Sequence, residues 1–120
     1  MLGDDNDSSS FRAVFRSLFQ QVIGETGVRV LEYHFRRLSS SDMYSLLSED
    51  PGEFYRVLTR FFGAGAKAFL RIIASELVTR YELDDISVDE LMGILTGERA
   101  GSRKKLVELI ARIRSKGGES

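Results

Sequence analysis

Apolar residues recur at steps of three and four along most of this chain, a spacing that gathers them on one face of an α-helix. The first such stretch starts after Ser9 or Ser10, whose hydroxyl can accept a hydrogen bond from an unpaired backbone N–H, and it ends at Gly24. A second stretch, 26–38, starts at a capping Thr26. The apolar positions of the two stretches are Phe11, Val14, Phe15, Leu18, Phe19, Val22 and Ile23, and then Val28, Leu31, Phe35 and Leu38.

Two polar signals divide the middle of the chain. The serines at 39–41 interrupt the second helix and are expected to cap a short helical turn at 43–47. Asp50, Pro51 and Glu53 form a clearer start signal, because Asp caps a helix, Pro fits its first position and Glu suits its third. The apolar stripe of the helix that follows is Phe54, Val57, Leu58, Phe61 and Phe62.

The small residues at 63–66 come next, and Gly63 and Gly65 mark a candidate bend or break in the helix. The segment 67–81 is apolar on most sides, which is typical of a buried central helix. Ser87 and Glu90 form a capping box for a short helix at 88–95. A last helix, 102–115, turns four apolar residues inward: Leu106, Leu109, Ile110 and Ile113.

These patterns predict an all-α fold, a single compact bundle of five to six helices in which 67–81 is central. The domain spans 9–116, and disordered tails are expected at 1–8 and 117–120. Oppositely charged residues four apart, Glu32 with Arg36 and Glu76 with Arg80, are expected to form ion pairs along their own helices.

Composition supports a domain with a real core. The chain has 120 residues, of which 42% are hydrophobic, with eight Phe and no Cys. The lack of Cys excludes disulfides, thiolate metal sites and a Cys nucleophile. No apolar run approaches the roughly 18 residues of a membrane span, and the acidic N-terminus does not resemble a secretory signal. We therefore expect a cytoplasmic protein without membrane contact.

Charge is distributed unevenly. Although the net charge of the chain is −1, the segment 99–116 holds seven cations against one acid, a net +6. This basic C-terminal helix is a candidate interface for nucleic acid or an acidic partner, or a docked helix with solvated cations. The candidate contacts are Arg99, Arg103, Lys104, Lys105, Arg112 and Lys116.

Other features give weak chemical signals. The glycines at 63–66 lack the preceding strand and following Lys-Ser/Thr of a phosphate loop. His34 is the only histidine, and it is expected at the edge of the core rather than on a metal. The acids near Asp84 and Asp85 lack calcium-loop spacing and suit a helix start. No nucleophile, base and orienting acid converge in the pattern, so neither an enzyme nor a cofactor is expected.

One stretch has a family resemblance. The order Pro51-x-Glu53-Phe54-x-x-Val57-Leu58, followed by 62–66 and an apolar helix, resembles small helical domains of archaeal signalling chains, which are grouped as output domains. The similarity covers residues 20–82. It implies an all-α fold and a regulatory or interaction role, and it carries over no catalytic residues.

The favoured function is therefore protein–protein interaction or signalling output, with self-association into a homodimer as one form of it. We expect that eight Phe in a small bundle leave some exposed at such an interface. Two alternatives remain open: nucleic-acid binding through the basic helix, and a small-molecule sensor with an interior apolar pocket.

Overall fold

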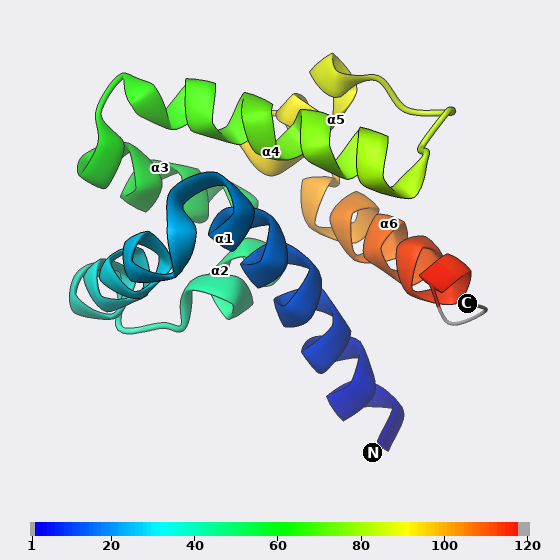
Figure 1. The fold of residues 1–120 in the computed structure, drawn as a ribbon, viewed down its shortest axis with the longest axis horizontal. Helices are drawn as coiled ribbons and strands as arrows, with labels where there is room; N and C mark the ends of the chain where they lie inside the picture. The colour runs from blue at the N-terminus through cyan, green and yellow to red at the C-terminus, as the bar shows by residue number, and fades with distance from the viewer. Residues whose placement is uncertain (1, 118–120) are drawn as a thin grey trace.

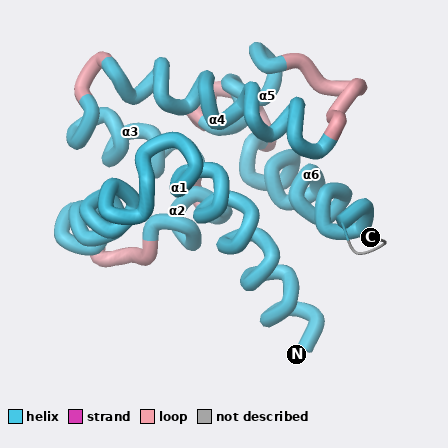
Figure 2. The backbone as a smooth tube through the Cα atoms, in the orientation of Figure 1, coloured by secondary structure: helices cyan, strands magenta, loops and turns pink. Residues whose placement is uncertain are grey.

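The computed structural model describes the backbone of residues 2–117 and the side chains of residues 11–113. The described chain forms six helices and no strand (Figure 2). Its radius of gyration is 13.5 Å, close to the roughly 13.6 Å of a compact chain of this length. The prediction of an all-α bundle is confirmed. The helices are α1 (Leu2–Ser39), α2 (Met43–Glu49), α3 (Pro51–Phe62), α4 (Gly65–Tyr81), α5 (Val88–Leu95) and α6 (Ser102–Gly117).

Helix α1 is bent sharply at Gly24, where the backbone leaves the helical region with φ 79° and ψ 168°. Figure 1 shows the chain turning there between a first arm, residues 2–23, and a second arm, residues 25–39. That conformation is essentially restricted to glycine. The break predicted at Gly24 is therefore present, but the helical pattern resumes at once and Thr26 lies inside α1.

The start of α1 differs from the sequence prediction. Its helical backbone begins at Leu2, so the helix does not start at Ser9 or Ser10 and the tail predicted at 1–8 is largely helical. Extending an existing helix costs far less than nucleating one. At the other end α6 includes Gly117, and 118–120 lie outside the described residues.

The core lies where the first arm, the second arm, α3 and α4 meet, and it is rich in aromatic rings. Phe54 stacks on Phe35 with ring centroids 5.1 Å apart and on Phe19 at 6.4 Å. Phe69 of α4 approaches Phe19 at 5.4 Å. Six of the eight Phe are buried and the other two are half-buried. The expectation of exposed Phe is therefore wrong.

Helix α4 is not the buried central helix that its composition predicts. It packs against α1, α3 and α5, but it runs along the outside of the bundle (Figure 1). Its inward side includes Phe69, Ile73 and Leu77, whereas Ile72 on the outward side is 48% exposed. Its neighbour Arg71 is exposed as well.

The glycines at 63–66 break the helix rather than bend it. Gly63 ends α3 with φ 61° and ψ −135°, and its N–H donates to the carbonyl oxygen of Thr59 at 2.6 Å. Gly65 is the first residue of α4. A residue with a side chain rarely adopts the Gly63 backbone angles, so this glycine lets α4 leave α3 after a two-residue turn.

The starts of α3 and α5 follow the predicted capping chemistry. The Asp50 carboxylate accepts a hydrogen bond from the Glu53 N–H at 3.2 Å, and Ser87 with Glu90 completes a reciprocal capping box. Helix α2 differs from the prediction, because its cap is Asp42, whose carboxylate accepts a hydrogen bond from the Ser45 N–H at 3.0 Å. An ionised carboxylate is a strong acceptor for that N–H, and the serines at 39–41 do not cap the helix.

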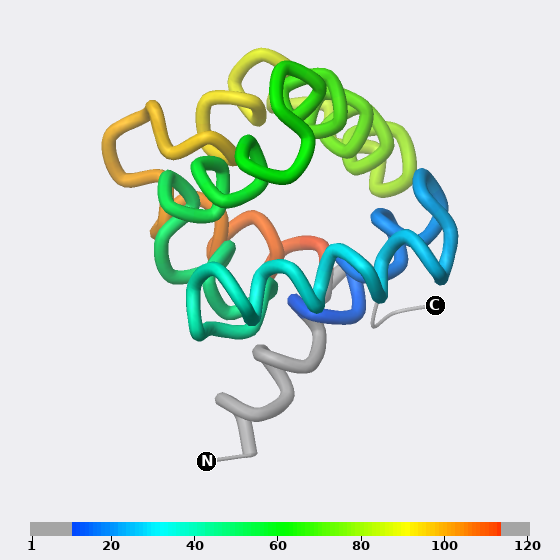
Figure 3. Tube along the Cα trace, turned by 90° about the vertical axis from the view of Figure 1, so that its left-hand side faces the viewer, coloured from blue at the N-terminus to red at the C-terminus, as the bar shows by residue number. Residues whose placement is uncertain are grey.

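Helix α6 is part of the bundle. Its four predicted inward residues are all buried, with 0–4% of their surface exposed. It packs against α5, α1 and α2, and Figure 3 shows it beside the first arm. The C-terminal helix therefore docks on the core, a point that the sequence left open.

Candidate interaction surfaces

The candidate basic residues of the C-terminal segment differ in their surroundings. Arg99, Lys105 and Arg112 line a hollow of about 260 Å³ between α6 and the chain around α5. Arg103 and Lys104 are exposed but do not line it. The side chain of Lys116 lies outside the described residues.

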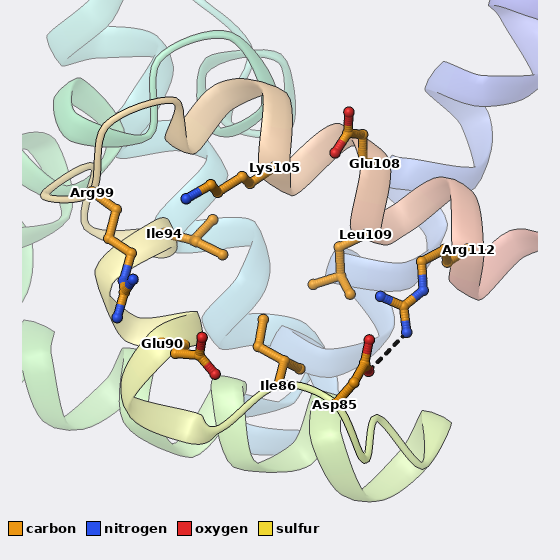
Figure 4. A pocket seen from close by; sticks show the side chains of 9 residues that line it. All are labelled: Asp85, Ile86, Glu90, Ile94, Arg99, Lys105, Glu108, Leu109 and Arg112. Atoms are coloured by element: carbon orange, nitrogen blue, oxygen red, sulfur yellow. Dashed lines mark hydrogen bonds and ion pairs between the residues drawn. The ribbon is translucent and has the colours of Figure 1, made fainter.

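Three acids share this hollow with the three cations (Figure 4). Asp85 pairs with Arg112 at 2.9 Å, and this hydrogen bond raises the pKa of the Arg112 guanidinium. Glu90 and Glu108 complete the acidic lining, and the apolar lining is Ile86, Ile94 and Leu109. Opposed charges within one hollow weaken its attraction for an external phosphate, because field contributions of opposite sign cancel.

Sequence reasoning missed this compensation, although a signal was present. The segment 76–98 carries seven acids against one cation, a net −6, directly before the +6 segment. A hairpin of neighbouring helices brings two such segments together, and α5 does pack against α6. The residues outside 99–116 carry a net charge of −1 − 6 = −7, and −6 of this lies in the segment directly before the basic helix.

The turn between α5 and α6 places Arg99 at the edge of the hollow. The Gly93 carbonyl oxygen accepts hydrogen bonds from the N–H groups of Glu98 at 3.0 Å and Arg99 at 3.2 Å. The Arg99 side chain then lies across Gly93, where an added Cβ would come within 2.8 Å of the Arg99 Cγ. Gly93 therefore leaves room for this orientation of Arg99.

A second charged cluster joins the two arms of α1 to α2. The Tyr44 hydroxyl donates to the Glu32 carboxylate at 2.7 Å, and Arg16 pairs with the same carboxylate at 3.3 Å. Arg12 pairs with Asp42 at 2.8 Å and lies 5.0 Å from the centre of the Tyr44 ring. Burial raises the pKa of Tyr44 well above its usual value, so its hydroxyl stays a hydrogen-bond donor at a pH where an exposed tyrosine ionises.

These contacts correct both predicted ion pairs. Glu32 does not pair with Arg36, because it faces Arg16 and Tyr44. Glu76 accepts a hydrogen bond from Gln21 at 3.1 Å, and Arg80 donates to Ser17 and to the same glutamine. In both cases a residue from a neighbouring helix replaces the partner four positions along. The cluster around Tyr44 is mutually satisfied, which is the arrangement expected of a structural network.

His34 and the acids near 84–90 occupy structural positions. His34 is half-buried, with its ring centroid 4.8 Å from that of Phe61, so it does lie at the edge of the core. Asp89 pairs with Arg71 at 3.1 Å, and Glu90 belongs to the capping box. Among residues with described side chains, no group of three or more His, Asp or Glu could hold a metal ion.

An apolar stripe on the second arm of α1 is the surface that sequence reasoning did not find. Val30, Tyr33 and Leu38 are 43%, 54% and 42% exposed. At the α-helical rotation per residue they lie within less than half of the circumference of the helix. The described chain has two other exposed large hydrophobic residues, Ile72 and Val107, and each lies on a different helix.

Leu38 shows why the stripe was missed. Its spacing from Leu31 predicted that both face the core, and Leu31 is indeed buried. Leu38 is the next-to-last residue of α1, and the chain turns away directly after the helix, at Ser40 with φ 63°. It therefore remains 42% exposed and joins the outward surface.

Comparison of the chain with protein-family models, with curated proteins and with solved structures gave no match. None of the described helices has both the length and the apolar character required to cross a membrane. The residues themselves are therefore the basis for a functional inference.

Proposed function

We propose that this chain is a non-enzymatic protein-binding module and that the apolar stripe Val30, Tyr33 and Leu38 is its binding surface. The observation that supports this proposal is the concentration of exposure: three of the five exposed large hydrophobic residues of the described chain lie within nine positions of one helix. Single exposed apolar residues are ordinary, whereas grouped ones mark interaction surfaces. Tyr33 is exposed and aromatic, the kind of side chain that is enriched at binding hot spots.

The buried side of the same arm holds the stripe in a fixed position. Val28, Leu31 and Phe35 are fully buried, and Glu32 is tied to Arg16 and Tyr44. The backbone beneath the stripe is thus anchored at successive turns. A rigid surface binds a partner without a further cost of ordering, which favours recognition by this arm over recognition by a mobile loop.

The test uses a displayed library of random peptides, because the partner is unidentified. Peptides selected on the wild-type chain would be measured against a variant carrying Val30→Ser, Tyr33→Ser and Leu38→Ser. The matched control carries Ile72→Ser and Val107→Ser, which remove exposed apolar side chains elsewhere. The five residues are 42–54% exposed, so each substitution should lower the free energy of unfolding by about 1 kcal/mol.

We expect the stripe variant to lose affinity by about tenfold or more, the effect of removing one hot-spot residue, and the control to bind as wild type does. Peptides that bind both variants equally would refute the proposal. A selection that enriches no peptide would refute it as well.

Nucleic-acid binding through α6 is the second candidate. It is favoured by Arg103, Lys104 and Lys105, which are exposed and form no ion pair within the described side chains. Their replacement by Gln should abolish binding to a DNA oligonucleotide, and wild-type binding should fall steeply between about 50 and 200 mM salt. Affinity that is unchanged in the triple variant would end this alternative.

A further inference from the structure

We infer that the apolar stripe binds an acidic amphipathic helix of a partner protein; this rests on the proposed function and adds the chemistry of the partner. The first observation is the sign of the charges around the stripe. The second arm carries the acids Glu25 and Glu32. Glu25 pairs with Arg29 at 3.1 Å, and Glu32 is turned inward to Arg16 and Tyr44.

The cations that remain on the second arm are exposed. Arg36 and Arg37 are both exposed, and neither forms an ion pair with a described side chain. The Arg37 guanidinium lies 5.8 Å from the centre of the Tyr33 ring, which places a positive charge directly beside the stripe. The free charge on this surface is therefore positive.

The neighbouring helix α3 contributes an aromatic ring beside the second arm. Phe61 contacts His34 with ring centroids 4.8 Å apart, so a half-buried aromatic ring borders the second arm. A surface that combines apolar side chains with unpaired arginines complements a partner that carries apolar residues flanked by carboxylates.

The length of the stripe fits a helix. Val30 and Leu38 are eight residues apart, about 12 Å along the helix axis. A partner helix covers such a distance with apolar residues at i, i+3 or i+4, and i+7, the usual anchors of helix recognition. A second copy of this chain fits less well, because each copy presents Arg36 and Arg37, and like charges across an interface oppose association.

Two probe peptides of about 18 residues, long enough to form a helix on binding, test the inference. Both carry Leu at the same helical positions, and one has Glu and the other Lys at the remaining charged positions. Binding of each labelled peptide to the full chain would be measured by fluorescence anisotropy at about 50 and about 300 mM salt. The variants are Arg36→Glu with Arg37→Glu, the Ser substitutions of the stripe, and Arg103→Glu with Lys104→Glu as a control of equal charge change.

We expect the Glu peptide to bind about tenfold or more tightly than the Lys peptide at low salt, and less so at high salt. Replacement of Arg36 and Arg37 by Glu should reverse this preference, whereas replacement of Arg103 and Lys104 by Glu should leave it unchanged. The stripe variant should weaken binding of both peptides.

The outcomes separate the two proposals. If both peptides bind equally and the stripe variant binds neither, the stripe is a binding surface but the acidic partner is wrong. If the stripe variant binds the Glu peptide as wild type does, the proposed function fails. Light scattering across a range of concentrations tests whether a second copy of the chain binds the stripe instead. If the wild-type chain forms a dimer and the stripe variant does not, the stripe is a self-association surface and the inference is overturned.

Discussion

Replacement of Gly97 by Ala should destabilise this fold more than replacement of any glycine that lies in open space. Gly97 follows α5 with φ 77°, and a Cβ added there would lie 2.5 Å from the backbone nitrogen of Gly52 and 2.6 Å from its Cα. Gly52 belongs to the first turn of α3, which Asp50 caps and where Pro51 is buried. Backbone atoms cannot rotate away as a flexible side chain can, so α3 and the end of α5 must separate.

The expected magnitude has two parts. Holding Ala in a left-handed backbone conformation costs about 1–2 kcal/mol, and forcing atoms into a packed contact costs about 1–3 kcal/mol more. The sum of about 2–5 kcal/mol is a large part of the roughly 5–15 kcal/mol that stabilises a typical domain. At roughly 4 °C per kcal/mol for a chain of this length, the thermal midpoint should fall by about 8–20 °C.

Two control variants isolate the steric part. Gly101 has φ 74° and nothing within 4 Å of an added Cβ, so Gly101→Ala should cost only the strain of about 1–2 kcal/mol. Gly52→Ala tests the other side of the contact. Its Cβ would meet the Asp50 Oδ1 at 3.7 Å and the Thr96 carbonyl oxygen at 3.9 Å, which are ordinary distances, so the variant should be neutral or gain up to about 1 kcal/mol.

Urea unfolding followed by circular dichroism at 222 nm, the α-helical band, gives the free energy of each variant, and an unchanged m value shows that the unfolding transition has kept its character. The reasoning requires the order Gly52→Ala, then Gly101→Ala, then Gly97→Ala, from most to least stable. A Gly97→Ala variant as stable as Gly101→Ala would show that α3 and the end of α5 are not in backbone contact.

Three further substitutions have defined outcomes. Gly24→Ala should lower the free energy of unfolding by about 1–3 kcal/mol, because φ 79° and ψ 168° are strained for any other residue; urea unfolding measures it, and no loss would mean that α1 is not bent there. Tyr44→Phe should cost about 1.5–3 kcal/mol through loss of the hydrogen bond to the Glu32 carboxylate, and equal stability in a thermal melt would contradict the network. Asp50→Ala should cost about 1 kcal/mol with faster amide exchange in the first turn of α3; unaltered exchange would argue against the cap.

The sequence determined the features that depend on residues close together in the chain. The Asp50 cap, the capping box of Ser87 and Glu90, and the turn at Gly24 were all predicted, and the structure contains all three. Capping and turn formation are decided within a few residues, so the local sequence is sufficient. The inward face of α6 was predicted for the same reason, since its apolar residues follow one helical period.

Only the tertiary structure decided which surfaces remain uncovered and which charges meet. Leu38 has the spacing of a core residue, yet no neighbour covers it, and α4 has the composition of a central helix, yet Ile72 is exposed. Glu32 could pair within its own helix but instead meets Arg16 and Tyr44. Helical periodicity fixes the direction of a side chain relative to its own axis, whereas burial and pairing depend on where the other helices pack, and that arrangement depends on the whole chain.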